Sequence, residues 1–347
     1  MNGPQTTTRR HGVTVPLAGV PLAGHRDLVV EIADLGYTDL WSAEADGSDA
    51  FTPLALASQW APGLRLGTAI VPAFTRGPAL IAQSAAALAA ASGGRFVLGL
   101  GTSSDVIVER WNGVPFDRPY QRVRDTVRCV KALLAGEKVT EEYETFTIRG
   151  MRLADPPDGP VPVMVAALRS GMLGLAGREA DGAIVNWLSA DDVRTVAPYV
   201  RETDPAKEIV ARIFVCPTDD ADRARAVGRR MITAYLNVPV YAAFHRWLGR
   251  GDDLAKMWDA WRAGDRQGAL DAVPDSLVDE LLVHGSPGAC RDHVEAYREA
   301  GVTTPVLMLI APDDTRGIHQ PPPMDTRGIH QPPPMQAAAA LRNLAPR

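Results

Sequence analysis

Cysteine and long apolar runs are scarce in this sequence of 347 residues, and their scarcity excludes several classes of protein. The three cysteines, Cys129, Cys216 and Cys290, are so far apart that neither a disulfide framework nor a metal-binding spacing can be built from them. The longest alanine- and leucine-rich run, residues 85–91, is far shorter than the ~20 apolar residues of a membrane-spanning helix. Residues 1–10 are polar and lack the apolar segment of a secretory signal. We therefore expect a cytoplasmic protein with buried, reduced thiols, no metal site and no membrane partner.

A surplus of one charge sign is also missing. The 36 lysines and arginines nearly balance 41 aspartates and glutamates, and no block of like charges stands out, which argues against a nucleic-acid partner. Lysine is rare, whereas arginine and alanine are abundant, as in a GC-rich bacterial gene. Hydrophobic residues make up 46% and charged residues 22% of the chain, which is typical of an ordinary soluble protein. The expected partner is a small-molecule substrate.

Short apolar runs rich in β-branched residues alternate with longer segments of helical period along most of the chain. This alternation is typical of βαβ units and a parallel sheet. Eight repeats favour a closed (β/α)8 TIM barrel over an open, doubly wound sheet. The predicted strands are 12–17, 39–43, 66–71, 96–100, 161–166, 182–186, 209–215 and 305–310. The predicted helices are 25–35, 50–60, 78–91, 119–134, 171–177, 191–200, 221–282 and 287–300.

Three segments depart from the repeating unit. Residues 139–149 alternate polar and apolar side chains and predict a β-hairpin inserted after the fourth helix. The tract 221–282 is too long for one barrel helix, so we expect a helical insertion, about 219–284, over the C-terminal mouth. The barrel domain is then 1–311. It leaves a tail, 312–347, in which the eleven residues 314–324 recur as 325–335.

Each copy of the tail repeat contains three consecutive prolines and few apolar residues, so the tail is expected to be extended or disordered. The repeat also places His319 and His330 at equivalent positions. A metal pair is one interpretation of these histidines. Tandem duplication in a tolerant tail is the interpretation we favour, and the tail is left out of the active site.

In a barrel of this kind, functional groups come from the C-terminal ends of the strands. The second strand ends in W-S-A-E, which places Glu44 near the mouth. Its carboxylate could orient a polar ring edge, act as an acid or base, form a salt bridge or cap the next helix, although Asp49 is the better-placed cap. The fourth strand carries Gly99 and Gly101 on one face, where glycine lets a flat ligand approach the backbone or simply forms a tight turn.

The fifth strand runs into L-R-S-G-M-L, with a helix starting near Ser170. Free N–H groups at a helix N-terminus, next to a cationic Arg169, form a ready site for an anion such as a phosphate. The alternative is that Ser170 is a plain N-cap.

Five ordered motifs resemble the bacterial luciferase-like monooxygenase superfamily, and within it the oxidoreductases that use the deazaflavin coenzyme F420. They are W-S-A-E (41–44), L-G-T-A-I-V-P (66–72), R-G-P-A-L-I-A-Q (76–83), S-G-G-R-F-V-L-G-L-G-T (92–102) and A-G-R-E-A-D-G (176–182). The resemblance covers roughly residues 12–310. It implies a flavin or deazaflavin ring across the barrel mouth, backed by a non-prolyl cis peptide at Ala69–Ile70. It also implies a homodimer, which is common in the family.

The resemblance also implies site residues. Glu44 is the candidate catalytic residue. The implied cofactor-binding residues are Ala43, Thr68, Ala69, Ile70, Gly99, Gly101, Thr102, Ala167, Arg169, Ser170, Gly171 and Met172. In F420-dependent sugar-phosphate dehydrogenases of this superfamily a histidine follows the second strand and a glutamate the fourth, whereas this chain has Glu44 and Ser104. A sugar-phosphate substrate is therefore disfavoured.

The sequence is compatible with three functions. The leading hypothesis is hydride transfer between F420 and a small organic substrate, with Glu44 handling a proton in a dry cavity. The runner-up is an FMN-dependent monooxygenase that needs oxygen and a reductase partner. The third is a flavin-binding barrel without turnover. The A-E pair after the second strand and a GC-rich composition, expected of F420-producing actinobacteria, favour the deazaflavin.

Overall fold

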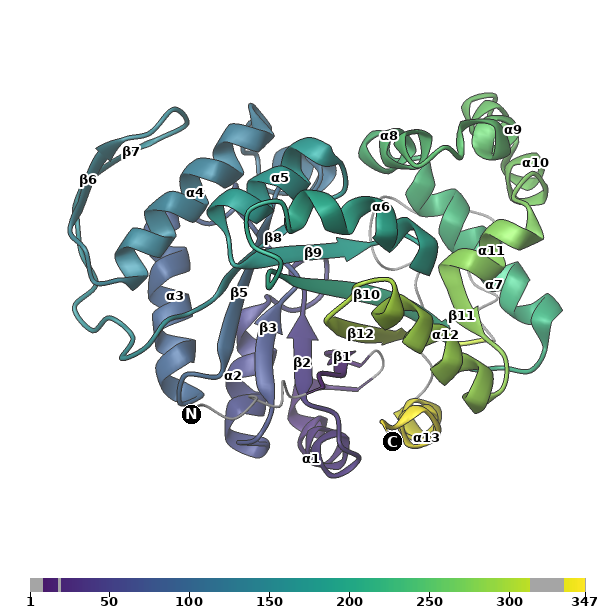
Figure 1. Cartoon of the computed structure of the whole chain (residues 1–347), viewed down its shortest axis with the longest axis horizontal. Helices are drawn as coiled ribbons and strands as arrows, with labels where there is room; N and C mark the ends of the chain where they lie inside the picture. Colours follow the sequence, from purple (N-terminus) through teal and green to yellow (C-terminus); the bar gives the residue numbers. More distant parts are fainter. Residues whose placement is uncertain (1–8, 18–19, 313–333, 347) are drawn as a thin grey trace.

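Eight parallel strands close into a barrel in the computed structural model, which describes residues 9–17, 20–312 and 334–346 (Figure 1). Around the barrel the order is β1, β2, β3, β5, β8, β9, β10 and β12, and β12 pairs with β1 to close it. The predicted TIM barrel is therefore confirmed. Its strands are β1 (Gly12–Thr14), β2 (Asp39–Ser42), β3 (Arg65–Thr68), β5 (Phe96–Gly101), β8 (Val163–Ala166), β9 (Gly182–Asn186), β10 (Glu208–Cys216) and β12 (Thr304–Leu309).

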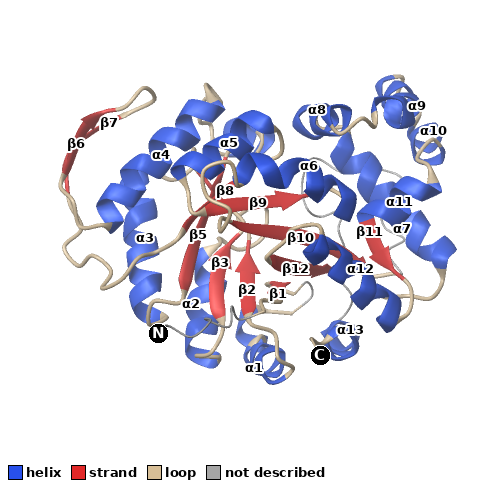
Figure 2. Cartoon of the chain, in the orientation of Figure 1, coloured by secondary structure: helices blue, strands red, loops and turns tan. Residues whose placement is uncertain are grey.

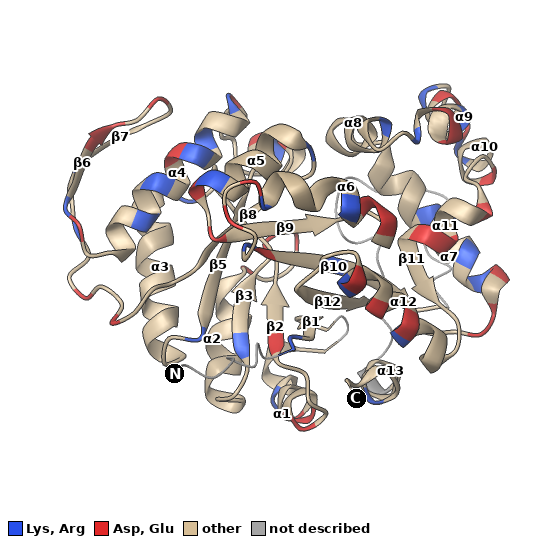
Figure 3. Cartoon of the chain, in the orientation of Figure 1, with Lys and Arg blue, Asp and Glu red and all other residues tan. Residues whose placement is uncertain are grey.

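Helices cover the barrel on the outside (Figure 2). Their apolar faces pack on the strands, while charged side chains gather on the helices and loops and the strands are mostly uncharged (Figure 3). The barrel helices are α1 (Arg26–Asp34), α2 (Phe51–Trp60), α3 (Pro78–Ala91), α4 (Pro119–Leu134), α5 (Ser170–Glu179), α6 (Ala190–Val200) and α12 (Pro287–Glu299). Two short helical turns, η1 (Leu22–Gly24) and the π-helix η2 (Val106–Trp111), lie in loops and were not predicted.

The predicted third strand, 66–71, is wrong as one continuous element. It splits into β3 and β4 (Val71–Pro72), with the Ala69–Ile70 peptide between them. Both parts pair with β5, because the chain resumes its path after the interruption. A periodic apolar pattern does not reveal such a break, since the side chains on both sides of it are buried or half-buried.

The predicted hairpin at 139–149 is present as β6 (Val139–Glu142) paired antiparallel with β7 (Thr147–Met151). The long tract 221–282 is helical but divided, into α7 (Ala221–Leu236), α8 (Pro239–Trp247), α9 (Gly251–Arg262), α10 (Arg266–Asp271) and α11 (Asp275–Leu281). It ends in an unpredicted short strand, β11 (Leu282–His284), which extends the sheet beside the end of β10. These helices have their own apolar core, which includes Trp258 and Leu254.

The tail is ordered at its end, contrary to expectation. Helix α13 (Pro334–Leu344) packs against α12, and Leu341 and Leu344 are buried. The hydroxyl of Tyr37 donates a hydrogen bond of 3.0 Å to the carbonyl of Leu341. The A-A-A-A-L run after the last proline is a strong helix former, and its apolar face has a docking surface on the barrel. Most of the repeat, with His319 and His330, lies outside the described residues.

The three cysteines are free and buried, as predicted. In the ranges that the structure describes, no helix is long and apolar enough to cross a membrane.

Candidate active site

The Ala69–Ile70 peptide, at the end of β3, is cis. The prediction of a non-prolyl cis bond at this position is confirmed. Backbone hydrogen bonds tie the segment to the end of β2: the Ala69 N–H donates to the Ser42 carbonyl over 2.6 Å, and the Glu44 N–H donates to the Ile70 carbonyl over 3.1 Å. The ends of two neighbouring strands therefore form one connected rim.

Gly99 and Gly101 lie directly behind this rim. A Cβ at Gly99 would stand 1.9 Å from the Thr68 carbonyl oxygen and 2.5 Å from Ile184 Cδ1, and one at Gly101 would stand 3.0 Å from Ile70 Cγ1. The Thr68 hydroxyl is also occupied, because it accepts from the Gly99 N–H and donates to the Gly99 carbonyl. Packing within the protein thus accounts for both glycines and for Thr68, and their contact with a cofactor stays a prediction.

Glu44 is engaged by an arginine. Arg76 Nε lies 3.0 Å from both carboxylate oxygens, and Arg76 Nη2 lies 2.9 Å from one of them. The same carboxylate accepts the Ala50 N–H at 3.3 Å. Asp49 Oδ1 accepts the Phe51 and Thr52 N–H groups, as the sequence predicted for the cap of this helix. The arrangement supports the salt-bridge alternative for Glu44.

The N-terminus of α5 is open. Its N-cap is Arg169, whose extended backbone leaves the helix with no side-chain cap. The alternative prediction, that Ser170 is the N-cap, is wrong, because Ser170 is already the first helical residue. Arg169, Ser170 and Gly171 are exposed, and a Cβ at Gly171 would meet nothing within 4 Å. Within the described residues no carboxylate pairs with Arg169, so a cation and free N–H groups face solvent together.

The remaining predicted residues lie around these two features. Ala43 and Met172 are half-buried, and Ala167 is buried, with its N–H bonded to the Ile184 carbonyl. The Thr102 hydroxyl donates to the Ser103 carbonyl at 3.1 Å, in the loop that leads to η2. None of these side chains carries a charge, so the charged groups of the rim are Arg169 and the Glu44–Arg76 pair.

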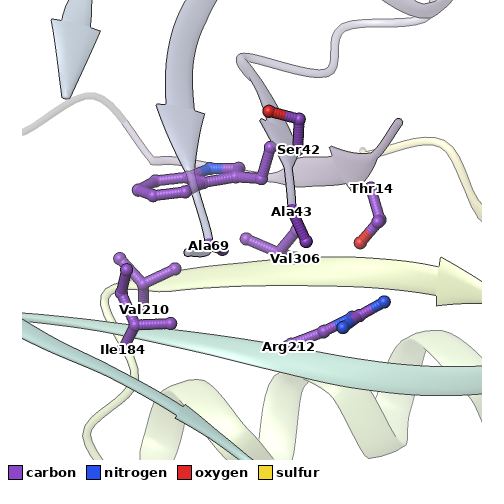
Figure 4. A pocket seen from close by; sticks show the side chains of 9 residues that line it. Thr14, Ser42, Ala43, Ala69, Ile184, Val210, Arg212 and Val306 are labelled. Atoms are coloured by element: carbon purple, nitrogen blue, oxygen red, sulfur yellow. The ribbon is translucent and has the colours of Figure 1, made fainter. Parts of the chain in front are cut away.

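A hollow opens inside the barrel next to the cis peptide (Figure 4). Its enclosed part, about 10 Å³, has room for about one water molecule, and the wider space of about 250 Å³ includes the open solvent at its mouth. Ala43 and Ala69 are the predicted cofactor residues that line it. Sequence reasoning missed the other members: Thr14, Trp41, Ser42, Ile184, Val210, Arg212 and Val306. The available signal was an arginine inside the apolar strand I-V-A-R-I-F-V.

The helical insertion covers the barrel beside this hollow. The centroid of the Trp187 ring lies 4.3 Å from that of Phe214 of β10 and 4.8 Å from that of Tyr235 of α7, with the rings tilted against each other. The Asn186 amide donates to the Tyr241 hydroxyl of α8 at 3.2 Å. These contacts join the insertion to the C-terminal ends of β9 and β10, as predicted. The result is a small, largely apolar hollow with an open, uncapped helix end on the same rim.

Comparisons with known proteins agree with this geometry. The family model described as luciferase-like monooxygenase matches residues 4–304 of this chain. A Mycobacterium tuberculosis protein named "Putative coenzyme F420-dependent oxidoreductase Rv3520c" is 28% identical over 86% of this chain and 94% of its own. The structure of coenzyme F420-dependent tetrahydromethanopterin reductase from Methanopyrus kandleri has a TM-score of 0.74 at 20% identity, covering 97% of both chains.

A flavin-containing relative shares the same fold. The oxygenating component of 3,6-diketocamphane monooxygenase from Pseudomonas putida, solved with FMN, has a TM-score of 0.60 at 18% identity over 86% of this chain and 91% of its own. The family match spans most of the chain and includes all five motifs that suggested the resemblance. This chain therefore belongs to the luciferase-like monooxygenase family.

Proposed function

We propose that this protein is an F420-dependent oxidoreductase, in which a hydride passes between the deazaflavin and a small organic substrate. The observation that carries the proposal is the pairing of an uncapped, arginine-flanked helix N-terminus with a walled apolar hollow on one barrel rim. The M. tuberculosis and M. kandleri relatives, whose names both include coenzyme F420, support the choice of cofactor.

The residues present fit such a cofactor. The side chains of Ala43 and Ala69 are small and leave the mouth of the hollow open. The open space at Gly171 leaves room beside the free N–H groups of α5. Ser170, Gly171 and Met172 would hold a phosphate through backbone N–H groups, and Arg169 would add a charged contact. When bound, the deazaflavin supplies the hydride donor or acceptor. The chain's part is to position the reactants and exclude water.

Replacing Arg169 by glutamine should weaken F420 binding about tenfold without changing stability, because an exposed charge-assisted contact contributes roughly 1–1.5 kcal/mol. Quenching of F420 fluorescence on titration with protein measures the affinity. The effect should shrink as salt is raised, since the contact is exposed and screened.

Arg178→Gln is the matched control, because Arg178 carries the same charge at the other end of α5 and should leave the affinity unchanged. A parallel titration with FMN separates the two cofactors. Tight FMN binding with no F420 binding would replace the proposal by the FMN-dependent monooxygenase, which needs oxygen and a reductase partner. Equal losses in both arginine variants would remove α5 from the site.

Because Glu44 forms an ion pair with Arg76, we expect its side chain to contribute to the stability of the fold. We expect Glu44→Gln and Arg76→Gln each to lower the free energy of unfolding by about 1–2 kcal/mol, and the double variant to be no less stable than the worse single one. Urea unfolding of the three variants measures this coupling. A fall in turnover of 100-fold or more in Glu44→Gln alone, with any substrate that the wild type converts, would instead support the catalytic role predicted from the sequence.

A further inference from the structure

One arginine points into the hollow from the middle of a barrel strand. Arg212 lies in β10, where its register partners are Asn186 of β9 and Val306 of β12. Its neighbours on the same face, Val210 and Phe214, are buried. Figure 4 shows the Arg212 side chain inside the hollow, near Thr14.

Arg212 is half-buried and has no counter-charge. Its Nε is fully buried and has no hydrogen-bond partner, and Nη2 contacts only the Met308 sulfur. The guanidinium carbon is 5.6 Å from the Phe214 ring. Across the described ranges of the chain, no carboxylate forms an ion pair with this side chain. Burial lowers the pKa of Arg212, which reflects the unfavourable setting of its charge.

The other deeply placed arginines have carboxylate partners. Arg65 pairs with Asp39 and Glu208, and Arg250 pairs with Asp192 and Glu280. A buried cation that serves only the fold is expected to be paired, because an unpaired charge in the interior is strongly unfavourable. Arg212 departs from this pattern, and it lines a hollow in which a ligand could supply the missing anion.

The rest of the lining describes that ligand. Two further buried polar atoms of the hollow, Thr14 Oγ1 and Trp41 Nε1, also have no partner. Together with Arg212 Nε, the residues that line the hollow therefore carry two N–H donors and a hydroxyl without partners, and most of the other lining side chains are apolar. Donors without a built-in acceptor suit a planar oxyanion, and a guanidinium matches a carboxylate in a bidentate pair. The enclosed part has room for little more than the carboxylate, so the apolar remainder of such a ligand would lie at the open mouth.

We propose that Arg212 binds the carboxylate of a small, otherwise apolar organic acid. Taken with the proposed F420-dependent reaction, on which this part rests, such acids are the substrate class of the enzyme. The binding itself does not depend on the cofactor, because the hollow and its unpaired donors are present in the chain alone.

Two matched pairs of small probes test the proposal: acetate with acetamide, and propionate with propionamide. Each pair has nearly the same shape and differs in charge. Isothermal titration of the full chain, with and without F420, should show that the carboxylates bind at least tenfold more tightly than the amides. Arg212→Met should abolish this preference and Arg212→Lys should retain part of it. Arg246→Gln, on the exposed face of α8, should leave it unchanged.

A stability measurement separates binding from folding. Arg212→Met should be at least as stable as the wild type in urea, because an apolar side chain replaces an unpaired buried charge. An unchanged carboxylate preference in Arg212→Met, or severe loss of stability in both Arg212 variants, would overturn the proposal. Loss of F420 affinity with the preference intact would assign the guanidinium to the cofactor instead. Failure of the wild type to bind F420, with carboxylate binding intact, would overturn only the proposed function.

Discussion

Alanine at Gly99 should destabilise the barrel by about 3 kcal/mol or more. The added Cβ would stand 1.9 Å from the Thr68 carbonyl oxygen, which belongs to the backbone, and 2.5 Å from Ile184 Cδ1. The side chain of Ile184 can move, but the backbone at Thr68 is held by its pairing with Ser42 of β2 and by the Thr68 hydroxyl, which bonds both the N–H and the carbonyl of Gly99. Relief of the clash therefore requires β3 and β5 to separate where they form the rim of the site.

Urea unfolding followed by circular dichroism measures the loss, and Gly63→Ala is the matched control. Gly63 lies in the turn before β3, and a Cβ there meets nothing within 4 Å. We expect this control to change stability by less than about 1 kcal/mol, in either direction. Gly101→Ala should fall between the two, since its closest contacts, at 3.0 Å, are with side chains. A Gly99→Ala protein as stable as the Gly63→Ala control would show that the close packing behind the rim is not essential.

The order of strands and helices could be predicted from the sequence because each element carries its own apolar period. The tight packing at Gly99 could not be predicted in this way. Glycine at this position is equally consistent with room for a ligand and with room for a neighbouring strand, and only the register of β3 against β5 distinguishes them. The break between β3 and β4 escaped for a related reason, since it changes the backbone without changing the apolar pattern.

Local sequence patterns give the least information about the partners of charged residues inside strands. Arg65 and Arg212 both lie in barrel strands, and nothing near them in sequence says which one is paired. Arg65 meets Glu208, which is 143 positions away, whereas Arg212 meets no carboxylate in the described structure. The difference depends on the closure of the barrel, and it separates an arginine that serves the fold from one that is available to a ligand. Glu44 is the opposite case. Its position at a strand end predicts a catalytic role, whereas its ion pair with Arg76 indicates a structural one.

Arg65→Met should cost about 3–5 kcal/mol, the largest loss expected from a single charge change in this protein. At the N-terminal end of the barrel Arg65 hydrogen-bonds Asp39, whose side chain is 0% exposed, and reaches Glu208 at 2.6 and 3.0 Å. Methionine would leave Glu208 without an ion-pair partner and Asp39 with only the longer contact to Arg10, at 3.5 Å, in a setting with little solvent. This end of a barrel supports stability rather than chemistry, so F420 affinity should be unchanged in the protein that remains folded.

The pH dependence gives an independent check on this cluster. Burial by itself would raise the pKa of Glu208, but the hydrogen bonds and charge of Arg65 outweigh it and hold the pKa below its ordinary value of 4.5. A pKa lower in the folded than in the unfolded state contributes stability above about pH 4.5, and this contribution is lost as the pH falls through the folded value. Without Arg65 the burial effect remains and raises the pKa of Glu208 in the folded state. Protonation at low pH therefore stabilises the folded variant, whereas it destabilises the folded wild type.

The stability gap between wild type and Arg65→Met should therefore be widest near pH 7 and should narrow below about pH 4.5 in urea unfolding at a series of pH values. The triple variant Arg65→Met, Asp39→Asn, Glu208→Gln should recover part of the loss at pH 7, because neutral amides are less costly to bury than unpaired carboxylates. A gap that stays constant from pH 7 to pH 4 would mean that Arg65 acts through packing on the Trp41 ring, 5.5 Å from its guanidinium carbon, and not through the two carboxylates.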